Sequence, residues 1–216
     1  MSFRYTKELL DNALTYDEYR RHISDVLNTA APDEQTKKML PYYAKNAALM
    51  DGFIDSYKVN KLMLEALRIA RPVTWLVITE GWCGDAAFIN PLLRHIEKAA
   101  HGKIELKFVL KDKHSDLMDA HLTNGGRSIP KLIVLNEHLE ALATWGPRPD
   151  ALQQQVLDWK AAGYSLKDLI EKVNNWYNED NTRETQHELR EHIYEYSGRK
   201  QSIERLENLN RLISSI

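Results

Sequence analysis

The sequence predicts an α/β fold with a βαβ-α-ββα core and added helices at both ends. Three observations support this prediction. Helical patterning fills the first part of the chain, β-branched and apolar runs begin at Val73, and polar helical patterning returns after Gly163. The expected division is an N-terminal helical extension at 1–70, a core domain at 71–162 and a C-terminal helical extension at 163–216.

The N-terminal extension carries local helix signals. Residues 15–18 have the spacing of a capping box, and residues 32–34 open a second helix with a proline and two acids. Pro41 is expected to kink or divide that second helix, because proline removes a backbone donor. The apolar positions of a short third helix fall at Leu62, Ala66 and Ile69.

The core begins where the hydrophobic period changes. Residues 73–79 are β-branched and nearly all apolar, which predicts a central strand buried on both faces. Residues 84–100 have helical spacing with Pro91 as a kink, and residues 104–110 alternate as a second strand, which completes a βαβ unit. The remaining core elements are predicted as a short helix at 117–121, strands at 131–135 and 139–145, and a helix at 149–162.

The C-terminal extension is predicted to be helical throughout. One helix starts at residues 165–168 and another covers residues 185–196. A narrow apolar stripe follows at Ile203, Leu206, Leu209, Leu212 and Ile213. This stripe predicts a helix that packs on the core, or that meets a partner or a second copy of the chain.

Composition excludes several classes of function. The chain has 216 residues, a formal net charge of −2 and 43% hydrophobic residues. This charge offers no attraction to nucleic acid or to an anionic membrane, and no segment approaches the ~18 apolar residues of a membrane span. The first residues also lack the apolar centre of a signal peptide. We therefore expect a cytoplasmic protein whose partners are proteins or small molecules.

Cys83 is the only cysteine, and it lies where the strand at 73–79 gives way to the helix at 84–100. A helix N-terminus offers unpaired N–H donors and the positive end of the helix dipole, which favour thiolate over thiol. Asp85 opposes this effect, so we expect the thiol pKa to fall only to the upper part of the range of roughly 3.5–7.5. An inert, buried cysteine is the alternative interpretation.

Two segments together resemble a known family. Residues 79–86 read Thr-Glu-Gly-Trp-Cys-Gly-Asp-Ala, and an Ile129-Pro130 step precedes a second apolar strand. With Pro91 in the intervening helix and the predicted strand order, these segments resemble the active-site turn and the cis-proline loop of the thioredoxin superfamily. The resemblance covers roughly residues 71–162 and implies a thioredoxin-like fold for the core.

The resemblance also implies a redox site. In the superfamily the tryptophan shields the sulfur, the cysteine attacks a disulfide or peroxide, and the residue before the cis-proline lends its backbone to the bound peptide. In this chain the resemblance assigns these three functions to Trp82, Cys83 and Ile129, respectively. The bond to Pro130 is expected to be cis and within contact distance of the thiol, and Gly84 completes the turn.

Arg127 is a further candidate for the site. It follows two glycines and precedes the proline step, and it could pair with a thiolate or with the carboxylate of a glutathione-like thiol. The alternative is an ordinary arginine in a solvated turn. Residues 145–149 are interpreted as a joint between strand and helix, near the same end of the sheet.

Three positions depart from the dithiol pattern of the superfamily. Ala86 replaces the second cysteine, so the chain cannot resolve a mixed disulfide internally. Val77 replaces the buried carboxylate that assists that second thiol, and Asp85 replaces the usual proline. Any turnover must therefore use an external thiol.

Three functions remain open. The first is a single-cysteine thiol–disulfide oxidoreductase, in which Cys83 forms a mixed disulfide with a protein disulfide or a low-molecular-weight thiol. The second is a non-catalytic protein-binding module. The third and least favoured is glutathione-dependent binding of an iron–sulfur cluster, by analogy with the Cys-Gly-x-Ser turn of monothiol glutaredoxins. The eight histidines show no zinc-type spacing, so no metal site and no cofactor beyond a glutathione-like thiol are predicted.

Overall fold

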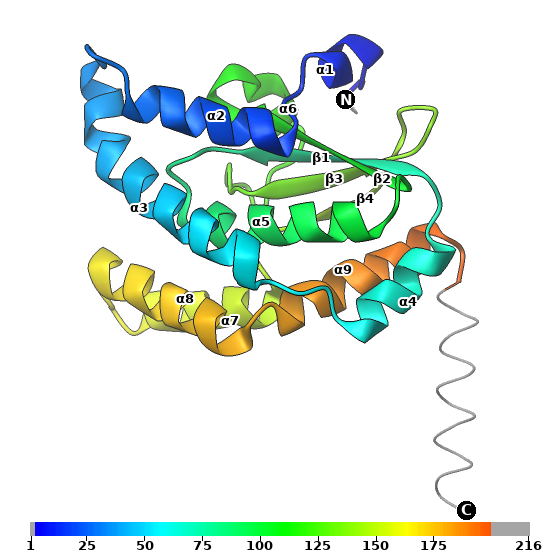
Figure 1. The fold of residues 1–216 in the computed structure, drawn as a ribbon. Helices are drawn as coiled ribbons and strands as arrows, with labels where there is room; N and C mark the ends of the chain where they lie inside the picture. Colours follow the sequence, from blue (N-terminus) through cyan, green and yellow to red (C-terminus); the bar gives the residue numbers. More distant parts are fainter. Residues whose placement is uncertain (1–2, 200–216) are drawn as a thin grey trace, which may run out of the picture.

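The computed structural model describes residues 3–199. Within this range four strands form one mixed sheet in the order β2-β1-β3-β4 (Figure 1). The central strand β1 pairs in parallel with β2 and antiparallel with β3, and β4 pairs antiparallel with β3. This arrangement confirms the predicted thioredoxin-like core. The strands are β1 (Val73–Thr79), β2 (Ile104–Leu110), β3 (Lys131–Leu135) and β4 (Ala141–Trp145).

Helices cover both faces of the sheet. Because successive side chains of a strand point to opposite faces, Trp75 and Val77 enter one apolar core, while Leu76 and Ile78 enter another. Burial on both sides explains the unbroken apolar run of β1. The first core is covered by α5 (Gly84–Ala99) and α7 (Asp150–Ala161), and the second by α1 (Lys7–Asp11) and α6 (Ser115–Asp119).

The rest of the N-terminal extension, after α1, packs on the first core. It forms the helices α2 (Tyr16–Leu27), α3 (Glu34–Ser56) and α4 (Lys61–Ile69). Thr15 and Glu18 form the expected capping box. Pro41 was expected to kink or divide its helix, and division is wrong, because α3 continues through this residue. One missing backbone donor is outweighed by the packing of α3 against α2 and α5.

Two details of the predicted elements also need correction. Leu62 and Ile69 were expected on the apolar face of α4, yet both are exposed, and the buried positions are Met63, Ala66 and Leu67. The strand β4 begins at Ala141 rather than at 139, because Leu139 has a positive φ of 61° in the turn that precedes it.

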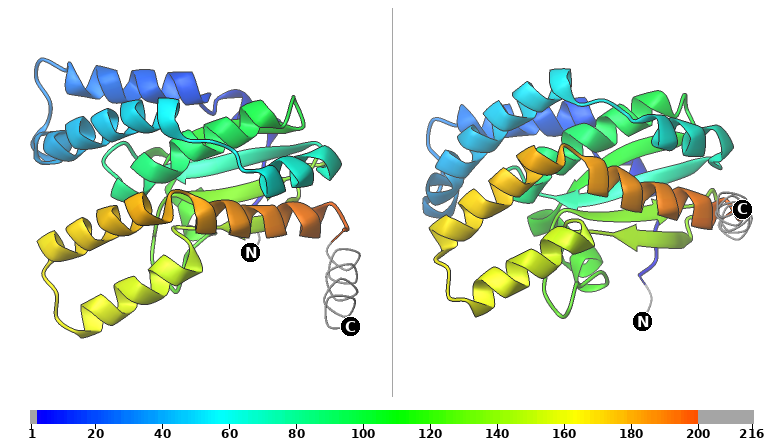
Figure 2. Two further views of the ribbon diagram at one scale, coloured as in Figure 1. Left: turned by 60° about the horizontal axis from the view of Figure 1, so that its bottom comes forward. Right: turned by 90° about the horizontal axis from the view of Figure 1, so that it is seen from below.

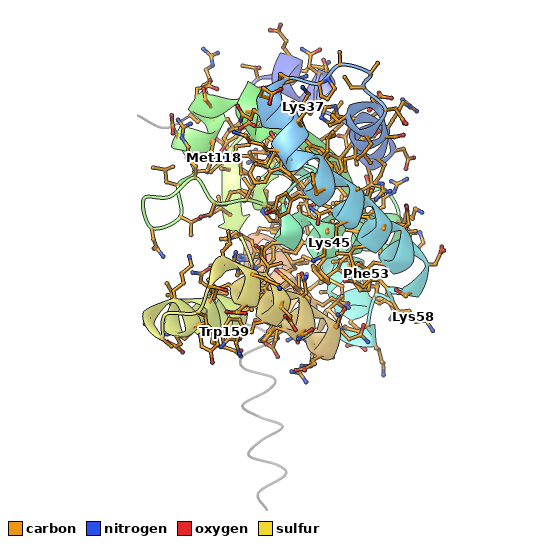
Figure 3. The ribbon with its side chains drawn as sticks, turned by 90° about the vertical axis from the view of Figure 1, so that its left-hand side faces the viewer. Lys37, Lys45, Phe53, Lys58, Met118 and Trp159 are labelled. Atoms are coloured by element: carbon orange, nitrogen blue, oxygen red, sulfur yellow. The ribbon has the colours of Figure 1, made fainter. Side chains whose placement is uncertain are left out.

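The C-terminal extension returns to the core as two helices. Figure 2 shows α8 (Leu166–Asp180) beside α7, and α9 (Arg183–Tyr196) running along α4. Gln186 of α9 hydrogen-bonds both the carbonyl of Lys58 and the N–H of Asn60, so the two extensions also contact each other. Figure 3 shows from the side Phe53 of α3 and Trp159 of α7, two partly buried side chains that both pack against the first core.

The apolar stripe predicted at 203–213 lies outside the described residues. Among the helices in residues 3–199, none combines the length and apolar character needed to cross a membrane.

Candidate functional site

Cys83 is the N-cap residue of α5, at the point where the chain leaves the carboxyl end of β1. Its side chain is buried, with only 7% of the residue exposed. The Sγ atom lies 3.2 Å from the carbonyl oxygen of Ile129, to which the thiol donates. The peptide bond between Ile129 and Pro130 is cis. The structure thus brings together the two segments that the sequence analysis singled out.

The protonation of this thiol differs from the sequence-based expectation. Burial, with a smaller contribution from the negative charge of Asp85, raises the pKa of Cys83 to about 12. The backbone N–H groups of Asp85 and Ala86 and the charge of Arg148 act in the opposite direction without prevailing. The expected lowered pKa is therefore wrong for the protein at rest, because desolvation of the sulfur outweighs the helix N-terminus.

Asp85 does not extend into solvent from the start of the helix. It is buried, and its carboxylate accepts a hydrogen bond at 2.5 Å from the guanidinium of Arg148 and another at 2.8 Å from the hydroxyl of Tyr177. The pKa of Asp85 is raised, because the effect of burial outweighs the opposing effects of Arg148 and Tyr177. The residue that replaces the usual proline of the turn therefore anchors the turn to two distant parts of the chain.

The other side of the turn is held by the N-terminal extension. The side chain of Asn46 in α3 donates to the carbonyl of Gly81 at 3.0 Å. An added Cβ at Gly81 would lie 2.8 Å from Ile23 and closer still to the ring of Tyr43, so only glycine allows this approach. Helices α2 and α3 therefore pack directly on the backbone that leads into the cysteine.

Glu80, three residues before the cysteine, is a buried acid that the sequence analysis missed. It is only 3% exposed, and its carboxylate accepts a hydrogen bond from the N–H of Asp112 at 3.0 Å. Burial raises its pKa to about 7, with the charge of Asp112 adding to the effect and the charges of Lys111 and Lys113 opposing it. Val77, the position predicted to have lost a buried carboxylate, is an apolar core residue.

The remaining predicted residues of the turn have distinct surroundings. Trp82 is half-buried, contacts both apolar cores and has the ammonium of Lys111 5.2 Å from its ring centroid. Gly84 is exposed, and an added Cβ would meet no atom within 4 Å. The surface beside the sulfur is therefore open at Gly84 and shielded at Trp82.

The loop before α7 lies against the proline step. Gly146 has a positive φ of 103°, and a Cβ there would lie 2.5 Å from the carbonyl oxygen of Pro130. Lys131, which is buried, donates to the carbonyl of Gly146 at 3.3 Å and to the hydroxyl of Thr123 at 3.0 Å. This packing places Arg148, two residues after Gly146, beside the start of α5.

The arginine that contacts the turn is not the one that the sequence suggested. Arg127 was expected to pair with the thiolate or a substrate carboxylate, but its guanidinium forms a two-bond ion pair with Asp119, and both side chains are about half exposed. Arg148, interpreted only as part of a joint, is the arginine that contacts the turn. Its position after the last strand was the available signal, whereas nothing local marks Tyr177.

This arrangement has definite chemical capacities. It presents one sulfur with two N–H donors that favour a negative charge and one carbonyl that orients the thiol. Within residues 3–199, no group of three or more His, Cys, Asp or Glu side chains is placed to hold a metal ion.

Comparisons with known proteins give a consistent result. Residues 33–162 match a family model described as thioredoxin. A protein of unknown function from Pseudomonas aeruginosa is 24% identical, with a TM-score of 0.51 over 80% of this chain and 95% of its own. An HIV epitope scaffold is 19% identical, with a TM-score of 0.51 over 94% of this chain and 97% of its own. These two structures support the fold alone, and no curated protein matches the sequence.

Proposed function

Because this chain belongs to the thioredoxin family, we propose that it is a single-cysteine thiol–disulfide oxidoreductase with Cys83 as the nucleophile. The position of the sulfur carries this proposal. Sγ lies at the N-cap of α5 and contacts the carbonyl of Ile129 at 3.2 Å, and the N–H groups of Asp85 and Ala86 act to lower its pKa. These donors stabilise the negative charge that a thiolate needs in order to attack a sulfur atom.

The proposed reaction proceeds through two exchanges. Cys83 first releases its proton to solvent, and the thiolate attacks one sulfur of a substrate disulfide. The new sulfur–sulfur bond forms as the substrate bond breaks, and the displaced thiolate takes a proton from water. An external low-molecular-weight thiolate then attacks the substrate sulfur of the mixed disulfide, so that Cys83 leaves as a thiolate. Full reduction of the substrate consumes a second external thiol, and the two external thiols end as a disulfide.

Burial of the sulfur sets the rate of the first step. With a pKa raised to about 12, only a small fraction of Cys83 is ionised at neutral pH. Exchange is therefore expected to be slow in the free protein and faster when a substrate displaces the groups that cover the sulfur. Gly84, the exposed residue next to Cys83, is the open approach to the turn.

The same burial favours a second candidate function. A cysteine that is 7% exposed, with a raised pKa and with Ala86 in place of a partner thiol, also suits a thioredoxin-fold module that binds proteins without redox turnover. In that case the surface around the turn would bind a partner, and the thiol would serve as a small packed side chain.

Mass spectrometry of the full chain separates the two functions. The protein is incubated with glutathione disulfide and returned to reduced glutathione, with Cys83→Ser as the control. The oxidoreductase predicts one glutathione adduct on native protein, removal of that adduct by reduced glutathione, and no adduct on the variant. An adduct that forms only after unfolding in urea would instead favour the binding module.

A further inference from the structure

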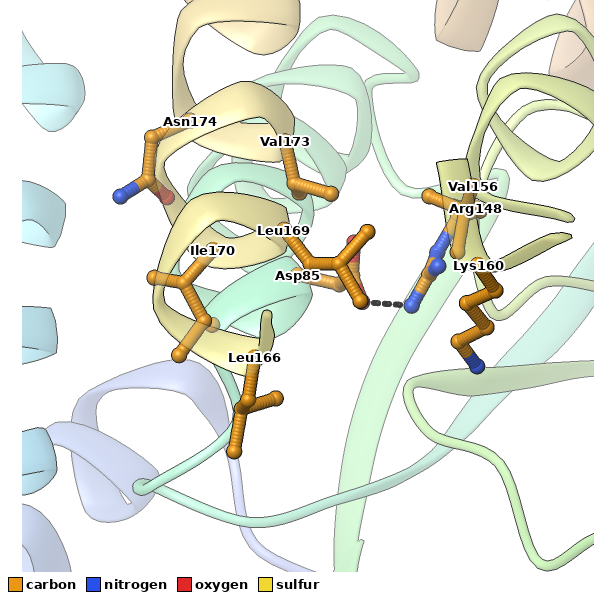
Figure 4. A pocket seen from close by; sticks show the side chains of 10 residues that line it. Asp85, Arg148, Val156, Lys160, Leu166, Leu169, Ile170, Val173 and Asn174 are labelled. Carbon is orange, nitrogen blue, oxygen red and sulfur yellow. Dashed lines mark hydrogen bonds and ion pairs between the residues drawn. The ribbon is translucent and has the colours of Figure 1, made fainter. Parts of the chain in front are cut away.

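A half-open cavity of about 220 Å³ lies beside the active-site turn (Figure 4). Figure 4 shows Leu166 and Ile170 of α8 on one side, Lys160 of α7 on the other, and the ion pair between Asp85 and Arg148 between them. Gly84, the residue after the cysteine, also lines the cavity. The cavity is therefore continuous with the turn that carries the thiol.

Half of the cavity comes from outside the region that matches the family. The match ends at residue 162, whereas α8 begins at Leu166 and supplies an apolar wall. Leu166 is 70% exposed, so its side chain is available to an apolar group that enters the cavity. The C-terminal extension thus adds an apolar surface to the site that the core fold alone does not provide.

The charges around the cavity are not balanced. Asp85 is neutralised by Arg148, so it does not repel an incoming anion. Lys160 is exposed, and its ammonium has no hydrogen-bond or ion-pair partner among residues 3–199. The cavity therefore combines an apolar wall with one available cation at its edge, a combination that selects a ligand with an apolar body and an adjacent negative charge.

We propose that this cavity binds a bulky apolar side chain of a protein substrate, followed by an acidic residue that pairs with Lys160. This inference rests on the proposed function, because it places the apolar residue within a few positions of the substrate cysteine. The cavity volume is sufficient for one large side chain. Substrates are then distinguished by the sequence that follows their cysteine.

The test uses short peptides whose cysteine is activated as a mixed disulfide with thionitrobenzoate, followed by Gly-Leu-Glu, Gly-Ser-Glu or Gly-Leu-Lys. The release of thionitrobenzoate by the full chain is measured for each peptide and divided by the rate with a small symmetric disulfide. The Leu-Glu peptide is expected to react about tenfold faster than the Ser-Glu peptide, as burial of one large aliphatic side chain implies. Equal normalised rates for the three peptides would overturn the inference.

Two variants assign the effect to the cavity. Lys160→Glu is expected to reverse the preference, so that the Leu-Lys peptide reacts faster than the Leu-Glu peptide. Leu166→Ser, at an exposed position where folding does not depend on the side chain, is expected to remove most of the advantage of leucine over serine. Lys167→Glu is the matched control. Lys167 lies on α8 and is exposed like Lys160, but it does not line the cavity. Reversal by Lys167→Glu as well would show a general charge effect and contradict the inference.

A binding measurement separates this inference from the proposed function. Cys83→Ser is titrated with fluorescent peptides that carry the same three sequences without activation. Preferential binding of the Leu-Glu peptide, with no reaction at Cys83 in the parent protein, would sustain the cavity and reject the oxidoreductase. Reaction at Cys83 without any peptide preference would sustain the oxidoreductase and overturn the inference about the cavity. If the parent chain proves to be a dimer in solution and Leu166→Ser is a monomer, with no peptide preference in either, the cavity is a self-association surface and the inference is overturned.

Discussion

The hydroxyl of Tyr177 donates a hydrogen bond at 2.8 Å to the carboxylate of Asp85, which lies 92 positions earlier in the chain. The ring of Tyr177 also stacks on Phe88, one turn further along α5, with 4.4 Å between centroids. Because Asp85 is two residues from Cys83, the C-terminal extension directly contacts the turn that carries the thiol. Helix α8 is therefore a structural component of the site.

Tyr177→Phe tests the energetic value of this contact. The variant keeps the ring on Phe88 and removes only the hydroxyl, which leaves one oxygen of a buried carboxylate without its partner. The free energy of unfolding is expected to fall by about 1–2 kcal/mol in urea titrations. Tyr42→Phe, at an exposed tyrosine, is the control and should change it very little. Equal effects of the two variants would show that the hydrogen bond does not contribute.

Asp85→Asn tests the electrostatic control of Cys83. Removal of the negative charge also leaves Arg148 unneutralised beside the turn, and both effects favour the thiolate. The pKa of Cys83 should fall, and alkylation by iodoacetamide near pH 8 should become about tenfold faster for each unit of that fall. Arg148→Met is expected to slow alkylation for the opposite reason.

Asp119→Asn is the matched control for this pair of variants, because it removes a carboxylate that pairs with an arginine on the surface. Its alkylation profile should overlay that of the parent protein. A profile for Asp85→Asn that also overlays the parent profile would mean that Asp85 has no electrostatic effect on the thiol.

Ala86→Cys tests the geometry of the turn. Ala86 and Cys83 are buried in the same apolar core, at the third helical position and the N-cap of α5. A thiol at Ala86 should pair with Cys83 under mild oxidation, and a thiol assay should then find no free groups. Ala87→Cys is the control, since Ala87 is equally buried but belongs to the opposite core. Two free thiols in oxidised Ala86→Cys would contradict the geometry.

Glu80 predicts how stability depends on pH. Its pKa is raised from 4.5 to about 7, so the folded protein holds this proton more tightly than the unfolded chain. The contribution of Glu80 to the free energy of unfolding is therefore largest below about pH 4.5 and falls as the pH rises to about 7. Glu80→Gln should remove this loss, which is on the order of 3 kcal/mol, and keep an acceptor for the N–H of Asp112.

Urea titrations of the parent protein and Glu80→Gln at pH 5 and pH 7.5 measure this effect. Other acids titrate in both proteins, so the difference between the two isolates Glu80. The stability gained by Glu80→Gln over the parent should be larger at pH 7.5 than at pH 5. A difference that is independent of pH would mean that Glu80 ionises in the folded protein as it does in the unfolded chain.

Local patterns were sufficient for the elements of the fold. The capping boxes at Thr15 and Ser165 depend on side chains three residues apart, and both are present in the structure. The strand β1 was predicted with its observed ends, because a buried strand requires an unbroken apolar run. Exposed and buried leucines within α4 could not be separated in this way, since the face that α9 covers is not encoded in α4 itself.

The sequence by itself determined the core fold and the turn that carries Cys83, because strand periods, helix caps and the proline step are local properties of the chain. Tertiary structure alone decided the state of the thiol and the identity of its neighbours. A pKa depends on desolvation and on charges brought close in space, and here burial against Ile129 outweighs the helix N-terminus. Arg148 and Tyr177 reach Asp85 only because the C-terminal helices fold back onto the core.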